Sequence, residues 1–146
     1  MTDVDVAAIR ADWAGTEFET ATFEIDATRL VDWAAACGET DPRFVDPDHP
    51  DFQAHPNFTA CLGTGRMLPE DFPRFGDGFG IDGGKTVDVH GPVRPGDTLT
   101  GRASVHDVYD KTGRSGTMVF IIHRMDFANE AGETVSTVDS KMIRRL

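Results

Sequence analysis

The feature that most constrains the fold is a change of hydrophobic period near residue 85. After it, four segments alternate apolar and polar residues, as strands with one buried face do. The segments are KTVDVHGPV, DTLTGRASVHDVYD, TMVFIIHRMDFAN and ETVSTVDSKMIRRL. They are separated by RPGD, KTGRSG and EAGE, which all have turn chemistry. The pattern predicts four long antiparallel strands, joined in series into a curved sheet.

The first half of the chain predicts one more strand and three helices. Alternating aromatic and β-branched residues over 18–26 favour a strand, and a short helix is expected within the first fifteen residues. After the strand, apolar residues recur at helical spacing between a possible cap at Asp26 and a stop at Gly38, which predicts a helix. A further helix is predicted over 57–68, where apolar and small residues share one side. Residues 69–84 contain many glycines and aromatic residues and are expected to be irregular.

This order of elements predicts an α+β fold. An antiparallel sheet curved around one central helix is the hot-dog arrangement, and residues 1–146 fit a single domain of this kind. Such a sheet leaves exposed edge strands, and dimers commonly join two sheets at an edge. We therefore expect a dimer.

Composition excludes several classes of partner. With 14 basic and 25 acidic residues the net charge is -11, which disfavours nucleic acids and anionic membranes. The N-terminus has acidic residues where a signal peptide has basic ones, and no apolar run is long enough to span a membrane. We expect a cytoplasmic protein. Neither the His nor the Cys spacing matches a metal site, so we expect no metal and no cofactor.

Three stretches resemble the MaoC-like (R)-specific enoyl-CoA hydratases and 3-hydroxyacyl dehydratases, and within them the N-terminal MaoC-like dehydratase domains. LVDWAAACGETDPRFVD resembles a helix followed by the family's G-D-x-N-P-x-H loop. AHPNF resembles the A-P-P-x-F that opens the family's central helix. The long stretch from GPVRPGD to EAGETV resembles the family's sheet, with its R-P-G-D turn and K-x-G-R-x-G hairpin. The resemblance spans roughly residues 17–146.

The resemblance implies addition of water to, or its removal from, an acyl thioester by an Asp and a His. In this chain Glu39 stands at the position of the Asp, Asp41 at that of the Asn and Phe44 at that of the His. Phenylalanine cannot transfer a proton, and the longer side chain of Glu39 shifts its carboxylate, which can cost about a hundredfold in rate. His55 lies next to Pro56, at the start of the expected central helix, and is the best substitute for the missing His.

The resemblance also implies partners and a binding surface. The ligand would be an acyl-CoA or an acyl-carrier thioester, and the chain would pair with a catalytic MaoC-like subunit or with itself. Lys111 and Arg114 could contact phosphates of the carrier arm. Side chains expected to line the acyl channel are Phe44, Phe58, Leu62, Met67, Phe72, Phe75 and Phe79.

Three functions follow, and the sequence leaves them open. The first is a non-catalytic subunit that shapes the acyl channel of a hydratase or dehydratase. The second is a stand-alone hydratase that uses Glu39 with His55. The third is a non-enzymatic hot-dog dimer that binds acyl-CoA. A thioesterase is the weakest alternative, because nothing beyond Glu39 marks a base or nucleophile.

Overall fold

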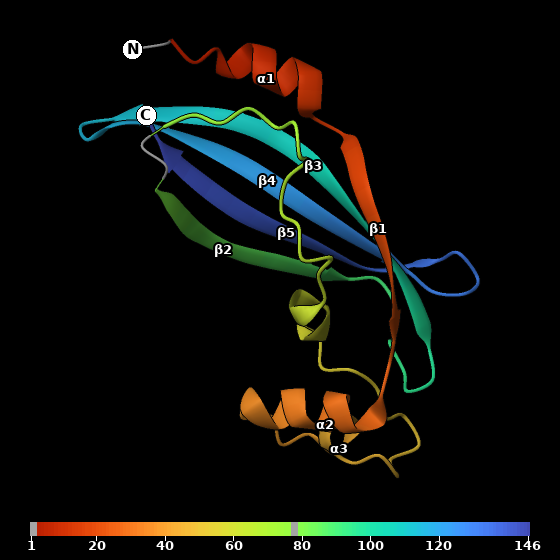
Figure 1. Ribbon diagram of the computed structural model, residues 1–146. Coiled ribbons are helices and arrows are strands. Elements are labelled where there is room, and N and C mark those ends of the chain that lie inside the picture. Colours follow the sequence, from red (N-terminus) through yellow and green to blue (C-terminus); the bar gives the residue numbers. More distant parts are fainter. Residues whose placement is uncertain (1–2, 77–78) are drawn as a thin grey trace.

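The computed structural model describes residues 3–76 and 79–146 and contains one curved, five-stranded antiparallel sheet (Figure 1). The sheet order is β1-β3-β4-β5-β2, so the two edge strands are β1 and β2. The predicted α+β hot-dog sheet is confirmed. The four strands expected in series are not all neighbours, because β2 pairs with β5 at the edge and not with β3, which follows it in the chain. The strands are β1 (Thr16–Glu24), β2 (Gly80–Val89), β3 (Thr98–Gly113), β4 (Gly116–Ala128) and β5 (Thr134–Arg145).

One strand begins earlier than the sequence indicated. β2 starts at Gly80, inside the segment 69–84 that was expected to be irregular throughout. A register shift between Asp82 and Lys85 accommodates two glycines in this strand, and glycine marks such irregularities in strands. Part of the expected irregular segment, residues 77–78, lies outside the described residues.

The helices are short. They are α1 (Val6–Trp13), α2 (Ala27–Ala36), the four-residue α3 (Pro42–Val45) and the 3₁₀ turn η1 (Phe58–Cys61). The predicted boundaries of α2 hold: the Asp26 side chain accepts a hydrogen bond from the Thr28 backbone at 2.9 Å. Gly38 follows the helix with a φ of 73°, a conformation that favours glycine.

The helix predicted over 57–68 does not form, so this prediction is wrong. Only Phe58–Cys61 is helical, and it is a single 3₁₀ turn. Two glycines follow, of which Gly65 adopts a φ of 86° that a right-handed helix cannot contain. Each glycine costs a helix about 1 kcal/mol relative to alanine, and a short helix has little propagation to offset its nucleation. Figure 1 shows η1 between α2 and the sheet.

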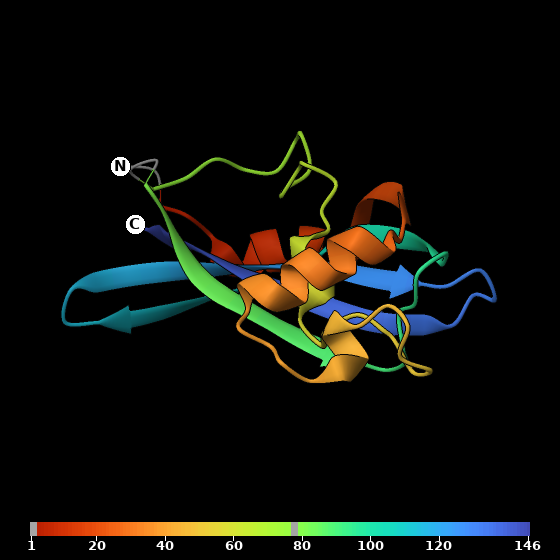
Figure 2. The ribbon, with the colours of Figure 1, turned by 90° about the horizontal axis from the view of Figure 1, so that it is seen from below.

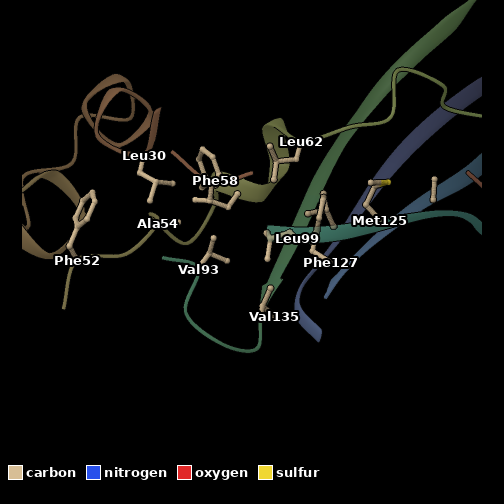
Figure 3. Close-up of a cluster of buried hydrophobic side chains, with 13 residues drawn as sticks. Leu30, Phe52, Ala54, Phe58, Leu62, Val93, Leu99, Met125, Phe127 and Val135 are labelled. Atoms are coloured by element: carbon tan, nitrogen blue, oxygen red, sulfur yellow. The ribbon is translucent and has the colours of Figure 1, made fainter. Parts of the chain in front are cut away.

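Two apolar clusters lie on the concave face of the sheet. The larger joins α2 and η1 to the sheet: Figure 3 shows Phe58 and Leu62 between Leu30 of α2 and Leu99 and Phe127 of the strands. The second cluster packs α1 and the segment around Phe72 and Phe75 over the other end of the sheet. Its fully buried strand residues are Val105, Val108, Val119 and Ile121.

Candidate active site loop

The loop after α2 places Glu39 and Phe44 by local capping. The Asp41 side chain accepts a hydrogen bond from the Arg43 backbone at 3.0 Å and so caps α3, which begins with Pro42. Asp, then Pro at the first helical position, is a common helix start. The single turn of α3 directs Phe44 inward, where it is 8% exposed.

Glu39 and His55 are in direct contact. His55 Nε2 lies 3.1 Å from Glu39 Oε2, and both side chains are partly buried. The other carboxylate oxygen, Glu39 Oε1, accepts hydrogen bonds from the backbone N–H groups of Thr40 at 3.0 Å and Asp41 at 2.9 Å. The structure therefore brings together the two residues that the sequence singled out, 16 positions apart.

A third residue, Asn57, fixes the protonation of His55. Trp33 Nε1 lies 2.7 Å from Asn57 Oδ1 and, because an indole nitrogen only donates, this atom must be the carbonyl oxygen. His55 Nδ1 lies 2.6 Å from the same oxygen and must also donate. If the imidazole were neutral, its Nε2 would direct a lone pair at Glu39 Oε2, and two acceptors would face each other. The contact therefore requires a proton between these two atoms.

That proton belongs to the imidazole. The backbone N–H groups of Asp41 and Thr40, followed by His55, hold the pKa of Glu39 below its usual value of 4.5, against a smaller opposing effect of desolvation. A carboxylate stabilised in this way stays ionised at neutral pH. Glu39 and His55 thus form a carboxylate–imidazolium pair, and each of their four polar atoms is engaged within the chain.

Phe44 covers the same imidazole. The Phe44 and His55 rings meet edge to face with centroids 5.4 Å apart, and the Arg43 guanidinium lies 4.8 Å from the Phe44 centroid. Behind them is a cavity of about 200 Å³. Its lining includes both rings together with Thr59, Val89, Pro92, Val135 and Ser136.

The other side chains expected to bind substrate are dispersed. Phe58 and Leu62 are core residues, 1% and 5% exposed. Phe72 and Phe75 line a cavity of about 590 Å³, and Met67 lines another of about 240 Å³. Phe79, directly before β2, is 75% exposed.

The two candidate phosphate-binding residues lie in the β3–β4 hairpin. Lys111 Nζ sits 5.3 Å from the centroid of the Phe120 ring, in a cation–π contact. Arg114 occupies the exposed turn. In both views this hairpin is at the opposite end of the sheet from α3 (Figures 1 and 2). Within one chain, these cations and the Glu39 loop do not form one site.

Sequence reasoning did not identify Trp33 and Asn57 as site residues. In the sequence, Trp33 falls within the predicted helix that becomes α2, and Asn57 is the first residue of the helix predicted over 57–68. Their roles depend on the path of the 39–57 connector, which turns Asn57 back toward α2. The only local signal was two polar side chains, His55 and Asn57, flanking a proline.

The chain was compared with known proteins. A family model described as "FAS1-like, dehydratase domain region" matches residues 12–138. A UPF0336 protein of Streptomyces coelicolor is 26% identical over 137 residues, which cover 86% of this chain and 87% of that protein.

Among solved structures, a MaoC-like dehydratase from Phytophthora capsici superposes with a TM-score of 0.74 at 24% identity, covering 97% of this chain and half (50%) of that one. The HadBC (3R-hydroxyacyl-ACP dehydratase) complex of Mycobacterium tuberculosis superposes with a TM-score of 0.67 at 22% identity, covering 90% of this chain and 93% of that one. The ChsH1–ChsH2 complex of the same organism superposes with a TM-score of 0.67 at 20% identity, covering 96% of this chain and 88% of that one.

These similarities agree with the fold. No helix in the described parts of the chain is long and apolar enough to cross a membrane. The family model covers most of the chain, including the altered loop from Gly38 to Phe44. The chain belongs to the family of FAS1-like dehydratase domain regions, and it shares the hot-dog fold of the MaoC-like structures.

Proposed function

We propose that this chain is the non-catalytic subunit of an acyl-thioester hydratase or 3-hydroxyacyl dehydratase, and that a second MaoC-like chain supplies the acid–base pair. The hydrogen bonding of Glu39 and His55 is the observation that carries the proposal. A general base needs a free lone pair directed at the water, and an imidazolium has none. Three of about four acceptor positions on the Glu39 carboxylate are already used.

The cavities of the concave face support a role in holding the acyl group. From Gly63 to Phe75 the chain crosses this face as irregular structure rather than as a helix. The cavities of about 590 and 240 Å³ adjoin this segment. Their lining combines aromatic, aliphatic and methionine side chains, which suit an acyl chain, with charged ones that include Arg66, Arg74 and Arg144.

Edge strand β2 supports association with a second sheet. It lies at one end of the sheet order, and nearly all of its residues are exposed. Ile81 and Val89 of this strand are 44% and 51% exposed. An apolar edge strand that stays unpaired promotes aggregation. Pairing with another MaoC-like chain, or with a second copy of this one, would cover it. HadBC and ChsH1–ChsH2 are both complexes.

One observation favours a second candidate, a stand-alone hydratase. The 3.1 Å contact between Glu39 and His55 is a carboxylate–imidazole arrangement of the kind that acid–base catalysis uses. For it to work, substrate would have to displace Glu39 or Asn57 from His55.

Hydration of a series of trans-2-enoyl-CoA thioesters separates the candidates. The chain is assayed alone and after co-expression with a MaoC-like protein that has an intact Asp/His loop. We expect turnover only with the partner. Turnover by the chain alone that is abolished by Glu39→Gln would establish the stand-alone enzyme. Saturable acyl-CoA binding without turnover in either preparation would indicate a binding protein.

A further inference from the structure

His123 is a buried imidazole that the proposed function does not use. It lies on β4, is 4% exposed, and neither ring nitrogen has a hydrogen-bond partner among the described residues. Buried polar atoms in proteins nearly always have a partner, because leaving one unpaired destabilises the fold. A polar group that is kept here at a cost to stability indicates a role in binding.

The strand register places His123 on the concave face, in a row with two other polar residues. His123 pairs with Ser140 of β5, and Ser140 pairs with Lys85 of β2. Directly paired residues point to the same side of a sheet. Lys85 Nζ donates a hydrogen bond to the Ala60 carbonyl of η1 at 2.9 Å, and η1 packs on the concave side.

This row lies between the two larger cavities. Ile121, two positions from His123 on the same face of β4, lines the cavity of about 590 Å³. Ser140 and Lys85 line the cavity of about 240 Å³. The segment 66–68 contributes to both linings and runs between them. His123 itself lines neither cavity, but its neighbours Ile121 on β4 and Ser140 on β5 each line one of them.

We propose that His123, Ser140 and Lys85 form a hydrogen-bonding site for a neutral oxygen function, a hydroxyl or carbonyl, on the body of the acyl group. The inference rests on the proposed function, because it presupposes an acyl ligand in these cavities. The row supplies hydroxyl, ammonium and imidazole donors, so it fits an acceptor oxygen.

The chemistry of the His123 ring fits a neutral oxygen group. Burial, and secondarily the nearby Lys85, lower the pKa of His123, so the imidazole is neutral and offers one donor and one acceptor. A hydroxyl group can use both.

A site of this kind discriminates strongly between acyl groups. A plain hydrocarbon leaves the imidazole unpaired, whereas an oxygen at the right carbon pairs it. Sites built to hydrogen-bond a ligand reject analogues that lack the group far better than apolar pockets reject an extra methylene. An oxygen-bearing acyl group is thus the expected substrate class.

The test compares dodecanoyl-CoA with its hydroxydodecanoyl-CoA isomers, hydroxylated at successive positions in the distal half of the chain. Binding is measured by calorimetry on the full chain, together with its partner where the two co-purify. We expect at least one isomer to bind roughly tenfold or more tightly than dodecanoyl-CoA. His123→Phe should remove that preference.

Two further variants guard against misfolding. Ser140→Ala is a small change that should reduce the preference, and Thr134→Val, at the exposed start of β5, is a matched control that should not. In the unliganded protein, His123→Phe should raise the melting temperature. The inference is overturned if dodecanoyl-CoA binds and no hydroxylated isomer binds more tightly. If no thioester binds, alone or in the complex, the proposed function fails with it.

Discussion

Asn57 holds the site together, and its replacement by alanine gives a stability change that can be worked from the structure. Asn57 Oδ1 accepts hydrogen bonds from Trp33 Nε1 at 2.7 Å and from His55 Nδ1 at 2.6 Å, in a half-buried setting. Each lost bond leaves a donor poorly solvated and costs about 1 kcal/mol or more, so Asn57→Ala should cost about 2–3 kcal/mol. For a domain of this size, that lowers the melting temperature by about 5–10 °C.

Urea unfolding followed by circular dichroism measures the free energy. A double-mutant cycle with Trp33→Phe isolates the shared bond, because the double variant has no unpaired indole N–H. We expect the double variant to be less destabilised than the sum of the single variants by about 0.5–1 kcal/mol. Asn57→Asp, which keeps the acceptor oxygen, is the matched control. A cost below about 0.5 kcal/mol for Asn57→Ala, or additivity in the cycle, would refute the assignment of the Asn57 oxygen and the protonation of His55 that follows from it.

Three further changes test other parts of the structure. The pKa of Glu39 lies below its usual value of 4.5, so the interactions of its carboxylate stabilise the fold fully above pH 4.5. This stabilisation is lost as the pH falls through the lowered pKa. Glu39→Gln should therefore make the free energy of unfolding, measured in urea, less dependent on acid pH. Gly101→Ala should cost about 1–3 kcal/mol in thermal unfolding, because its Cβ would come within 2.8 to 3.0 Å of three core side chains; an unchanged melting temperature would contradict the packing. Asp139→Asn should cost about 1–2 kcal/mol, because Arg124 donates to both carboxylate oxygens at 2.7 and 2.8 Å; a matching loss in Arg124→Gln would support the pair, and no loss in either would contradict it.

The sheet could be predicted from sequence because its signals are local. Alternation with period two and the turns RPGD, KTGRSG and EAGE locate three strands of the meander to within a few residues. The Asp26 cap and the Gly38 stop likewise locate the two ends of α2. Each of these signals depends on residues only a few positions apart.

The prediction over 57–68 failed because spacing was given more weight than backbone preference. Phe58, Leu62 and their neighbours do share one side, but in the structure they reach the core from a 3₁₀ turn and an extended segment. The glycines at 63 and 65 indicated this outcome. Burial of an apolar set does not by itself require a helix.

The candidate site could be predicted only in part. The family loop identified Glu39 and Phe44, and position alone suggested His55. Two long-range contacts decide their chemistry. Glu39 and His55 are 16 positions apart in the sequence, and Trp33 and Asn57 are 24 positions apart. Local pattern does not encode contacts of that range, because they depend on how the connector folds back on α2.

The central claim is that Glu39 and His55 form a structural ion pair and take no part in catalysis. Glu39→Gln tests it directly, because glutamine keeps the geometry: its oxygen can accept from the Thr40 and Asp41 backbone, and its N–H can donate to a neutral His55 Nε2. The measurement is kcat for enoyl-CoA hydration by the complex of this chain with its MaoC-like partner. The account predicts a kcat within about twofold of the unaltered complex. A fall of about a hundredfold or more, the usual cost of removing an acid–base group, would contradict it.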